Sequence, residues 1–315
     1  MIKSGVSVII CCHNSARRLP ETLKYIAYQK VPESISWEVI LVDNASTDNT
    51  TESASKLWKE NGRPTSLRIL EEKQVGLSFA RHAGFTNAKY EYCLFCDDDN
   101  WLDRNYVTTA YKIMQKDGQI GVLGGVGEAV CETEKPEWFE DYKQCYAVGP
   151  QSTVEGDITK LKGHVYGAGA VFRKSVYDSL VCAGFKNILK DRTGKSLSSG
   201  GDVELCYVYA LNGWKIFYSH KLKFQHFIPS GRLNKRYPRR IIREYKKCEV
   251  VLMLYKYKMN NEHILKKKYL WLREVVYIFR QEYKYLIKPR YLLVSRFYAL
   301  LINRSLFVSA LKELR

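Results

Sequence analysis

The sequence predicts an α/β fold with a mixed, mainly parallel sheet and helices on both of its faces. Over the first hundred residues, short apolar runs alternate with helical stretches, which is typical of parallel strands joined by crossover helices. Polar clusters follow the first, second and fourth runs, and ligands bind at the carboxyl ends of such strands. The chain then becomes basic, aromatic and helical, so we expect a main domain of residues 1–230 and a helical basic extension of residues 231–315.

The early elements each have their own signal. The strands are continuous apolar runs, as expected for strands buried on both faces, at 6–12, 37–42, 67–70 and 92–96. Leu19, Leu23 and Ile26 share one face of the first helix, and Asn61-Gly62 is a stop signal for the second. A third helix is expected at 79–89.

The middle of the chain is more mixed. Glycine-containing strands are expected at 121–130 and 164–173, and a helix is expected at 200–212. Two late strands are expected at 214–218 and 221–227.

Positive charge is concentrated in the last third of the chain. Residues 221–315 hold 24 Lys or Arg and 6 Asp or Glu, a net charge of +18, whereas the whole chain carries +17. This third is expected to meet an anionic partner, either nucleic acid or a membrane surface. Because there is no run of 18 uncharged apolar residues and no signal-type cleavage site, we expect neither a spanning helix nor a signal peptide. Nine cysteines, several of them within apolar runs, favour a reducing, cytoplasmic compartment.

Three adjacent carboxylates, Asp97, Asp98 and Asp99, end the fourth strand. Such charges repel one another unless a cation is present. Mn²⁺ or Mg²⁺ would suit oxygen ligands of this kind and would also bind substrate phosphates. The alternative is a solvated acidic turn. Taken alone, Asp43 after the second strand could only cap a helix, and His13-Asn14 could form a turn.

Asp202 opens a later helix, where the helix dipole favours an ionised carboxylate. Such a group near a metal-bound nucleotide could deprotonate a hydroxyl. The alternative is a helix cap with Glu204 in the first turn. Glu204 follows two residues later, so at helical spacing it points elsewhere.

Together these motifs resemble family 2 glycosyltransferases of the bacterial surface-polysaccharide type, which have the Rossmann-like GT-A fold. The resemblance covers roughly residues 4–230 and is carried by the order of Cys-His-Asn at 12–14, Asp-Asn-Ala-Ser-Thr-Asp at 43–48, Gly-Leu-Ser-Phe-Ala-Arg at 76–81, Asp-Asp-Asp-Asn at 97–100, Gly-Ala-Gly at 167–169, Gly-Gly-Asp-Val-Glu-Leu at 200–205 and a late His. It implies inverting transfer from a nucleotide-diphosphate sugar to a glycan or lipid-linked acceptor, with a divalent metal. The Gln-x-x-Arg-Trp motif of processive members is absent, which implies that one sugar is added per encounter.

The resemblance implies roles around the nucleotide. His13 matches the residue that lies against the base, and Arg81 matches a basic residue of the nucleotide pocket. Asp43 matches the acid that accepts a hydrogen bond from a uracil N–H, which favours a UDP-sugar. Gly167 belongs to the segment beside the donor sugar, where glycine lets the backbone approach a ligand.

The resemblance also implies a metal site. Asp99 matches the metal ligand, with Asp97 or Asp98 on the ribose or the metal, and the triplet leaves this register open. His226 resembles a late His that completes the metal site in some members. The alternative for His226 is a strand-end His bonded to backbone.

Asp202 matches the catalytic base, which removes the proton from the acceptor hydroxyl as that oxygen attacks the sugar C1. The family usually has an acidic pair here, but this chain has Gly201 before Asp202, so one acid remains.

The basic extension suits a membrane interface. Between 272 and 287, apolar residues recur at helical spacing with Lys and Arg around them, as in interfacial amphipathic helices. Docking on the inner face of the plasma membrane would bring the site to a lipid-linked acceptor. The alternative is that the apolar stripe packs on the catalytic domain or on a partner subunit.

Two other hypotheses compete with sugar transfer. A nucleotidyltransferase of sugar metabolism would need an early Gly-rich phosphate loop, which residues 11–14 do not provide. A nucleic-acid-binding module would use the basic extension, with affinity that falls steeply with salt, and would leave the acidic cluster without a role. We therefore expect no nucleic-acid partner.

Overall fold

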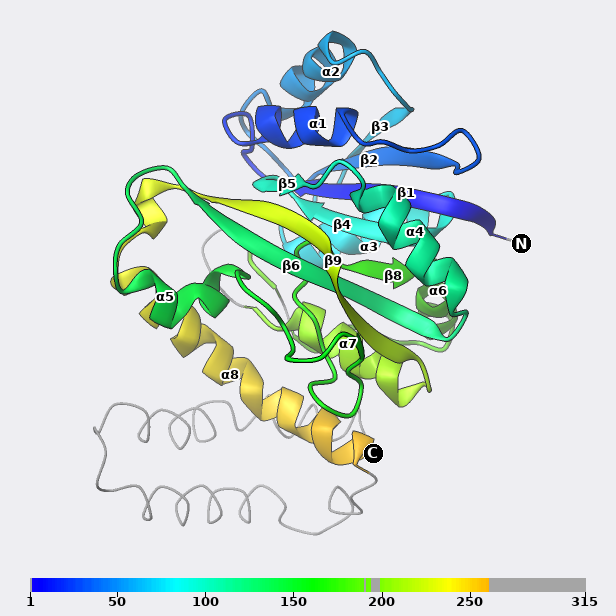
Figure 1. Cartoon of the computed structure of the whole chain (residues 1–315), viewed down its shortest axis with the longest axis vertical. Helices are drawn as coiled ribbons and strands as arrows, with labels where there is room; N and C mark the ends of the chain where they lie inside the picture. The colour runs from blue at the N-terminus through cyan, green and yellow to red at the C-terminus, as the bar shows by residue number, and fades with distance from the viewer. Residues whose placement is uncertain (1, 190, 194–198, 261–315) are drawn as a thin grey trace.

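The computed structural model describes residues 2–189, 191–193 and 199–260, which contain one nine-stranded sheet (Figure 1). The strands are β1 (Lys3–Cys12), β2 (Trp37–Asp43), β3 (Leu67–Glu71), β4 (Tyr90–Asp97), β5 (Asn100–Leu102), β6 (Ile120–Cys131), β7 (Gly156–Asp157), β8 (Val171–Arg173) and β9 (Lys215–Ile228). Their order is β3-β2-β1-β4-β8-β6-β9-β5, and β7 pairs with β9. The longer pairings, β1 with β2 and β4, β2 with β3, and β6 with β9, are parallel, whereas β5, β7 and β8 pair antiparallel. The predicted α/β fold with a mixed, mainly parallel sheet is confirmed.

Helices cover both faces of this sheet, and two hydrophobic clusters lie beneath them. One cluster includes residues of α1 (Leu19–Ala27), α2 (Thr50–Glu60) and α4 (Tyr106–Lys116). The other includes residues of α3 (Leu77–Asn87), α6 (Lys174–Cys182), α7 (Gly201–Leu211) and α8 (Arg236–Met259). Val8 and Ile10 of β1 enter the first cluster and Ile9 enters the second, because successive side chains of a strand point to opposite faces. Burial on both faces explains the unbroken apolar runs of β1, β2 and β4.

The expected strand at 164–173 is wrong over most of its length, because only 171–173 form β8. In the preceding segment, only the end next to β8 bonds to β4, through Gly169 and Ala170 with Phe95, and side chains bind N–H groups further back. Tyr166 N–H donates to Gln151 Oε1 at 2.6 Å, and Gly167 N–H donates to Asp202 Oδ2 at 2.8 Å. This segment is therefore a loop that crosses the sheet edge.

The two expected late strands are instead one continuous strand, β9, which pairs with β6 on both sides of an irregularity. The register passes from Gly124 opposite Tyr218 to Val126 opposite Lys223. The polar residues between 218 and 223 are the extra residues of this bulge, so they kink the strand without ending it.

The described part of the basic extension joins the body of the protein. Val251, Leu254 and Tyr255 of α8 are buried in the same cluster as α7, which lies beside α8 in Figure 1. For residues 236–259 the apolar stripe thus packs on the main domain. The amphipathic stretch predicted at 272–287 lies outside the described residues.

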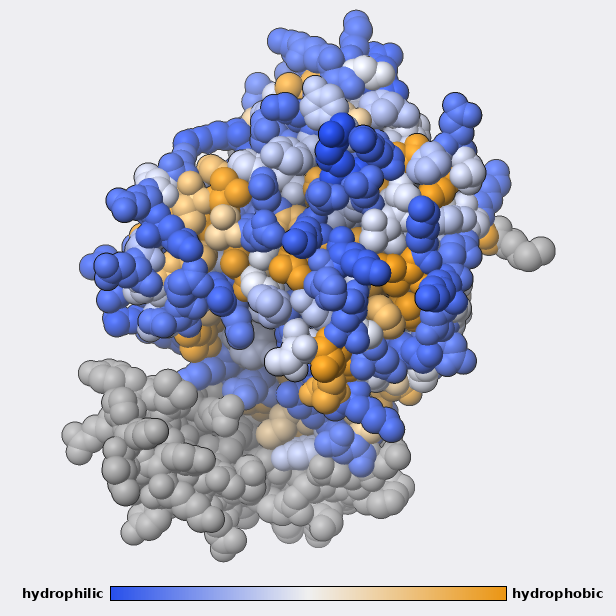
Figure 2. Space-filling model, in the orientation of Figure 1, coloured by the Kyte–Doolittle hydropathy of each residue, from blue (hydrophilic) through white to orange (hydrophobic). Residues whose placement is uncertain are grey.

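In the orientation of Figure 1, the surface is largely hydrophilic, with hydrophobic groups scattered between charged side chains (Figure 2). Within the described ranges, no helix combines the length and apolar character needed to span a bilayer. All nine cysteines are free thiols.

Candidate active site

A cleft of about 730 Å³ opens at the carboxyl ends of β1 and β4, where open α/β sheets bind ligands. Its lining includes these predicted site residues: His13, Arg81, Asp97, Asp98, Asp99, Gly167, Asp202 and His226. Among the described residues of the lining, Asp43 is not found. The fold therefore gathers side chains that are up to 213 positions apart in the chain around one cavity.

His13 lies on the loop that follows β1. Its Nδ1 contacts the carbonyl oxygen of Asn44 at 2.7 Å, and since a carbonyl only accepts, Nδ1 carries the proton. The Asn44 side chain donates to the carbonyls of Glu72 and Gln74 and accepts from the N–H of Gly76 at 2.7 Å. One amide thus joins the loops that follow β2 and β3, and the imidazole is held against them.

Asp43 is buried at the end of β2 and accepts a backbone hydrogen bond from Ser46 at 3.3 Å. This contact lies in the turn after β2, whereas the helix cap considered as the alternative falls to Asn49 at the start of α2. The predicted contact of Asp43 with uracil stays a prediction.

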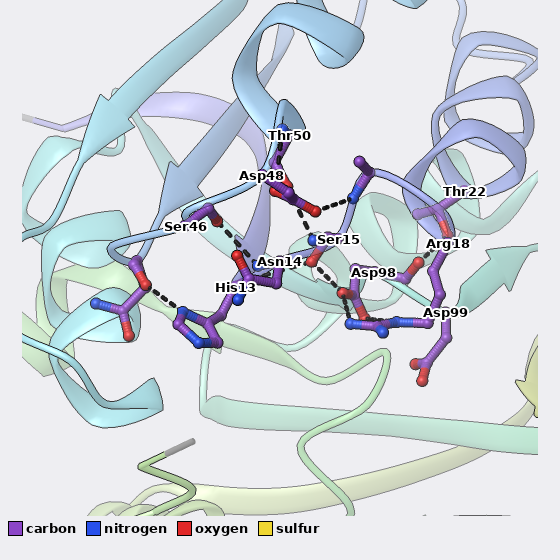
Figure 3. A network of polar contacts seen from close by, with 12 residues as sticks. His13, Asn14, Ser15, Arg18, Thr22, Ser46, Asp48, Thr50, Asp98 and Asp99 are labelled. Atoms are coloured by element: carbon purple, nitrogen blue, oxygen red, sulfur yellow. Dashed lines mark hydrogen bonds and ion pairs between the residues drawn. The ribbon is translucent and has the colours of Figure 1, made fainter. Parts of the chain in front are cut away.

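Asp98 is held by protein groups on every side (Figure 3). Arg18 donates to both carboxylate oxygens, at 3.2 Å from Nε and 2.5 Å from Nη2, and the Ser15 hydroxyl also donates to this carboxylate. The Thr22 hydroxyl donates to the Asp98 carbonyl at 2.9 Å. Burial and the charge of Asp99 raise the pKa of Asp98, although Arg18 opposes this rise. The Arg18 contact was not predicted, because nothing in the sequence pairs these two positions.

Asp99 faces an imidazole and a guanidinium contributed by the distant end of β9 and the turn after it. Its Oδ1 lies 3.4 Å from His226 Nε2, and its Oδ2 accepts from Arg232 Nη1 at 3.0 Å. The contact arises because β5 pairs with β9 and sets Asn100 opposite His226. Burial alone would raise the pKa of Asp99, but His226 and Arg232 lower it. Arg232 is a site residue that sequence reasoning missed.

The donor set around Asp99 fits a divalent ion. His226 Nδ1 contacts the Tyr146 carbonyl at 2.6 Å and so carries a proton, which leaves Nε2 directed at the Asp99 carboxylate. Without a second proton on the imidazole or a cation between the two groups, Nε2 and the carboxylate would be two hydrogen-bond acceptors facing each other. Burial and the charge of Asp99 also raise the pKa of Asp97, against the opposing charges of Arg81, His226 and Arg192. One oxygen and one nitrogen donor, completed by substrate phosphates, suit Mn²⁺ or Mg²⁺.

This potential metal site is incomplete when protein side chains alone are counted. Over the described ranges, no group of three or more His, Cys, Asp or Glu residues is arranged to hold a metal ion.

Asp202 lies in the first turn of α7 beside Gly167. Its Oδ2 accepts from the Gly167 N–H at 2.8 Å and its Oδ1 from the Val203 N–H at 3.0 Å. A Cβ at position 167 would lie 3.1 Å from Asp202 and 2.6 Å from Arg81 Nη2, so the close approach requires glycine. The carboxylate is therefore fixed in orientation at the cleft.

Arg81 lies partly buried beside this pair and donates to Asp191 Oδ2 at 2.8 Å. Burial alone would lower the pKa of Arg81, but Asp191, Asp202 and Asp97 raise it, so the guanidinium serves several carboxylates at once. Asp191 was not predicted, because it lies in a loop without a recognisable motif. Glu204 points away from the cleft as predicted, and it accepts from the backbone N–H groups of 188 and 189, each at 2.9 Å.

Four further side chains of the cleft lining feel the charge of Asp202: Lys162, His164, Tyr166 and Tyr245. Lys162 Nζ lies over the Tyr166 ring, 4.9 Å from its centroid. Burial raises the pKa of Tyr166 and of Tyr245 to about 12 and, with the charge of Lys162, lowers that of His164 to about 4. At neutral pH this wall of the cleft therefore presents neutral phenols and a neutral imidazole.

Comparison with known proteins identifies the family. The model described as glycosyl transferase family 2 matches residues 7–181, which is more than half of the chain. The chain belongs to glycosyl transferase family 2. The matched span includes the acidic triplet and Gly167, whereas Asp202 and His226 lie beyond it.

Curated relatives are similar to this chain over little more than a third of its length. The chain is 31% identical over 115 residues to a cholesterol galactosyltransferase of Borreliella burgdorferi, covering 36% of this chain and 30% of the relative. It is 31% identical over 124 residues to the glycosyltransferase GlyG of Streptococcus pneumoniae, covering 38% of each chain. The chain thus spans less than two fifths of the length of these relatives.

Solved structures share the fold over nearly the whole chain. S. aureus TarS 1–349 in complex with UDP-GlcNAc has a TM-score of 0.58 at 16% identity, covering 98% of this chain and 90% of that one. The mannosyltransferase PcManGT of Pyrobaculum calidifontis, in complex with GDP-Man and Mn²⁺, has a TM-score of 0.53 at 17% identity, covering 98% and 73%. The GT-A-like fold of this chain is confirmed.

Proposed function

We propose that the chain is an inverting glycosyltransferase that moves one sugar from a UDP-sugar to a hydroxyl group of a glycan or lipid-linked acceptor. The observation that carries this proposal is the single cleft in which the pair of Asp99 and His226 and the fixed carboxylate of Asp202 occur together. Family membership supports sugar transfer. The TarS complexes with UDP and UDP-GlcNAc support a UDP-sugar as donor.

In the proposed reaction, an acceptor hydroxyl attacks C1 of the donor sugar from the face opposite the nucleotide. As the new C–O bond forms, Asp202 takes the hydroxyl proton, and the bond between C1 and the diphosphate oxygen breaks with its electron pair leaving on UDP. A single displacement of this kind inverts the anomeric centre. The two backbone N–H bonds to Asp202 keep its carboxylate aligned.

Asp99 and His226 would hold Mn²⁺ or Mg²⁺, and Asp97 would lie on the ribose or the metal. When bound, such an ion compensates the negative charge of the diphosphate. The Mn²⁺ in the PcManGT complex supports this assignment. Asp98 would act through Arg18, because its carboxylate is already bound by that guanidinium. His13 would lie against the base, with Asp43 and Arg81 completing the nucleotide pocket.

The test is release of UDP from a panel of UDP-sugars with Mn²⁺ and candidate acceptors, together with UDP binding by calorimetry. We expect Asp202→Asn to lower kcat by about 10²–10⁴-fold, the usual contribution of a general base, while UDP still binds. The matched control is Asp141→Asn, which changes an exposed carboxylate in α5 (Phe139–Tyr142). Absence of UDP binding and of turnover across the panel would refute the proposed function.

The nucleotidyltransferase hypothesis finds no added support in the loop that follows β1. That reaction would use a free basic residue there, but Arg18 is bound to Asp98, and Arg17 pairs with Glu132 at 2.7 Å.

We also propose that the basic region brings the protein to an anionic membrane surface on the cytoplasmic side. Support comes from α8, where Arg236, Arg239, Arg240 and Arg243 are exposed while the apolar residues of the same helix are buried. Each such charge contributes about 1 kcal/mol near an anionic leaflet. Co-sedimentation with phosphatidylglycerol vesicles, but not with phosphatidylcholine vesicles, is the expected result. Equal binding to both would contradict the proposal.

A further inference from the structure

We propose that Asp191 supplies the second acidic group beside Asp202 from outside helix α7 and that, together with Arg81, it holds the first turn of α7 in its working position. Asp191 is then a positioning residue for the proton acceptor. This inference rests on the proposed function of Asp202.

Space is the first argument. Gly201 stands directly before Asp202, and a Cβ added there would lie 2.6 Å from Asp191 Oδ2 and 2.8 Å from its Cγ. The Asp191 carboxylate therefore occupies the volume in which a side chain at 201 would begin. An acidic residue at 201 and Asp191 in its present place exclude each other.

Hydrogen bonding is the second argument. Asp191 Oδ1 accepts from the N–H of Gly201 at 2.9 Å, which satisfies one of the N–H groups that the start of a helix leaves unpaired. Its other oxygen, Oδ2, accepts from Arg81 Nη1 at 2.8 Å. Asp191 is only 4% exposed, so both of its oxygens are committed inside the protein. The carboxylate thus ties α7 to α3 directly beneath Asp202.

Charge is the third argument. Burial raises the pKa of Asp191, Arg81 opposes that rise, and the charge of Asp202 adds to it. Burial in turn lowers the pKa of Arg81, and among the neighbouring charges Asp191 raises it most and Asp202 next. If the charge of Asp191 is removed, Arg81 is left with Asp202 as its nearest remaining anion on α7. The guanidinium would then attract the carboxylate of Asp202 more strongly, and this is the group that must accept the proton.

The charge-removing variant is Asp191→Asn, which keeps the size of the side chain and an oxygen that can accept from Gly201. We expect kcat to fall by about 10–100-fold with the KM for UDP-sugar changed less than threefold, because misplacement of a catalytic group affects the chemical step. We also expect the acidic limb of the pH–rate profile to move to lower pH. Asp141→Asn serves as the control that removes an equally negative but exposed group.

The relocation test moves the acid to the other position. Gly201→Glu alone should inactivate the enzyme, because the new side chain collides with Asp191. The double variant Asp191→Gly/Gly201→Glu should recover activity at least tenfold over either single variant. If the double variant is no more active than the less active single variant, an acid at position 201 cannot replace Asp191, and this part of the proposal is refuted.

Amide hydrogen exchange gives a readout that does not depend on turnover. In Asp191→Ala, exchange at 201–203 should accelerate by about tenfold or more relative to exchange in the middle of α7. Unchanged exchange together with unchanged kcat and pH profile would overturn the proposal, and so would a lowered Tm with an unchanged pH profile, which indicates a purely structural role. Failure of the proposed function would give a different result. The wild-type protein would show no turnover, while amide hydrogen exchange at 201–203 would still accelerate in Asp191→Ala.

Discussion

Gly167→Ala introduces one methyl group between the two groups that matter most in the proposed reaction. The added Cβ would lie 2.6 Å from Arg81 Nη2 and 3.1 Å from both Cβ and Oδ2 of Asp202. Arg81 cannot move away freely, since its side chain is partly buried and bound to Asp191 at 2.8 Å. The methyl group must therefore displace Asp202, the loop that carries Gly167, or both.

A shift of about 1 Å in a catalytic group costs on the order of 10²-fold in rate. We therefore expect kcat for sugar transfer to fall by about 100-fold, which corresponds to about 2.7 kcal/mol of transition-state stabilisation. Overpacking at a buried site costs about 1–3 kcal/mol of unfolding free energy, so Tm should fall by a few degrees and the protein should stay folded. Steady-state UDP release, calorimetric UDP binding and thermal melting measure the three quantities.

Gly118→Ala is the matched control. A Cβ at position 118 would have no heavy atom within 4 Å, and neither Gly118 nor Gly167 has a positive φ, so both substitutions avoid left-handed backbone strain. We expect Gly118→Ala to leave kcat unchanged. If Gly167→Ala also keeps kcat within twofold of wild type, the close approach of this loop to Asp202 is not needed for the reaction.

Three further predictions test the surroundings of the cleft. Arg18→Ala leaves the partly buried Asp98 without its ion-pair partner and should cost about 2–4 kcal/mol of unfolding free energy. The control Arg17→Ala, at an exposed pair, should cost about 0–1 kcal/mol. Equal chemical-denaturation midpoints for the two variants would contradict this prediction. Asp99→Asn should raise the Mn²⁺ concentration for half-maximal activity by at least about tenfold after treatment with a chelator, and an unchanged Mn²⁺ titration would exclude Asp99 as a ligand. Because burial lowers the pKa of His164 to about 4, the unfolded chain binds a proton at this residue before the folded protein does, so stability falls as pH falls from about 6.5 to 4. In His164→Gln, the Tm should depend less on pH over that range. An unaltered slope of Tm against pH would show that another group is responsible.

The first four strands and three helices follow from local patterns, because each is a buried apolar run or an amphipathic stretch with its own stop signal. β5, α4 and α6 were not predicted. The three residues of β5 are too few to show a period, and they are a strand because β9 provides the partner. The loop at 164–170 carries strand-like residues, but the N–H groups of Tyr166 and Gly167 donate to the side chains of Gln151 and Asp202 and not to a strand.

The candidate site divides in a similar way. His13 and Asp99 are predictable because the end of a buried run is visible in the sequence and parallel strands bring such ends together, whereas Asp202 is marked by the Gly-Gly-Asp that opens α7. Arg232 and Asp191 are not predictable from these patterns. Each enters the site from an irregular segment whose path depends on tertiary packing.

The sequence alone specified an alternating α/β chain and the edge of the sheet at which polar groups collect, because hydrophobic periodicity and chain order indicate strand burial and crossover topology. The family was indicated separately, by the resemblance of its ordered polar motifs. Tertiary structure decided which carboxylates are free to act. Asp98 is bound by Arg18, Asp99 faces His226, and Asp191 stands where Gly201 leaves room. Arg18 and Asp98 are 80 positions apart in the chain, Asp99 and His226 more than 120, and Asp191 and Gly201 ten. Contacts of this kind depend on tertiary packing, which no local pattern encodes.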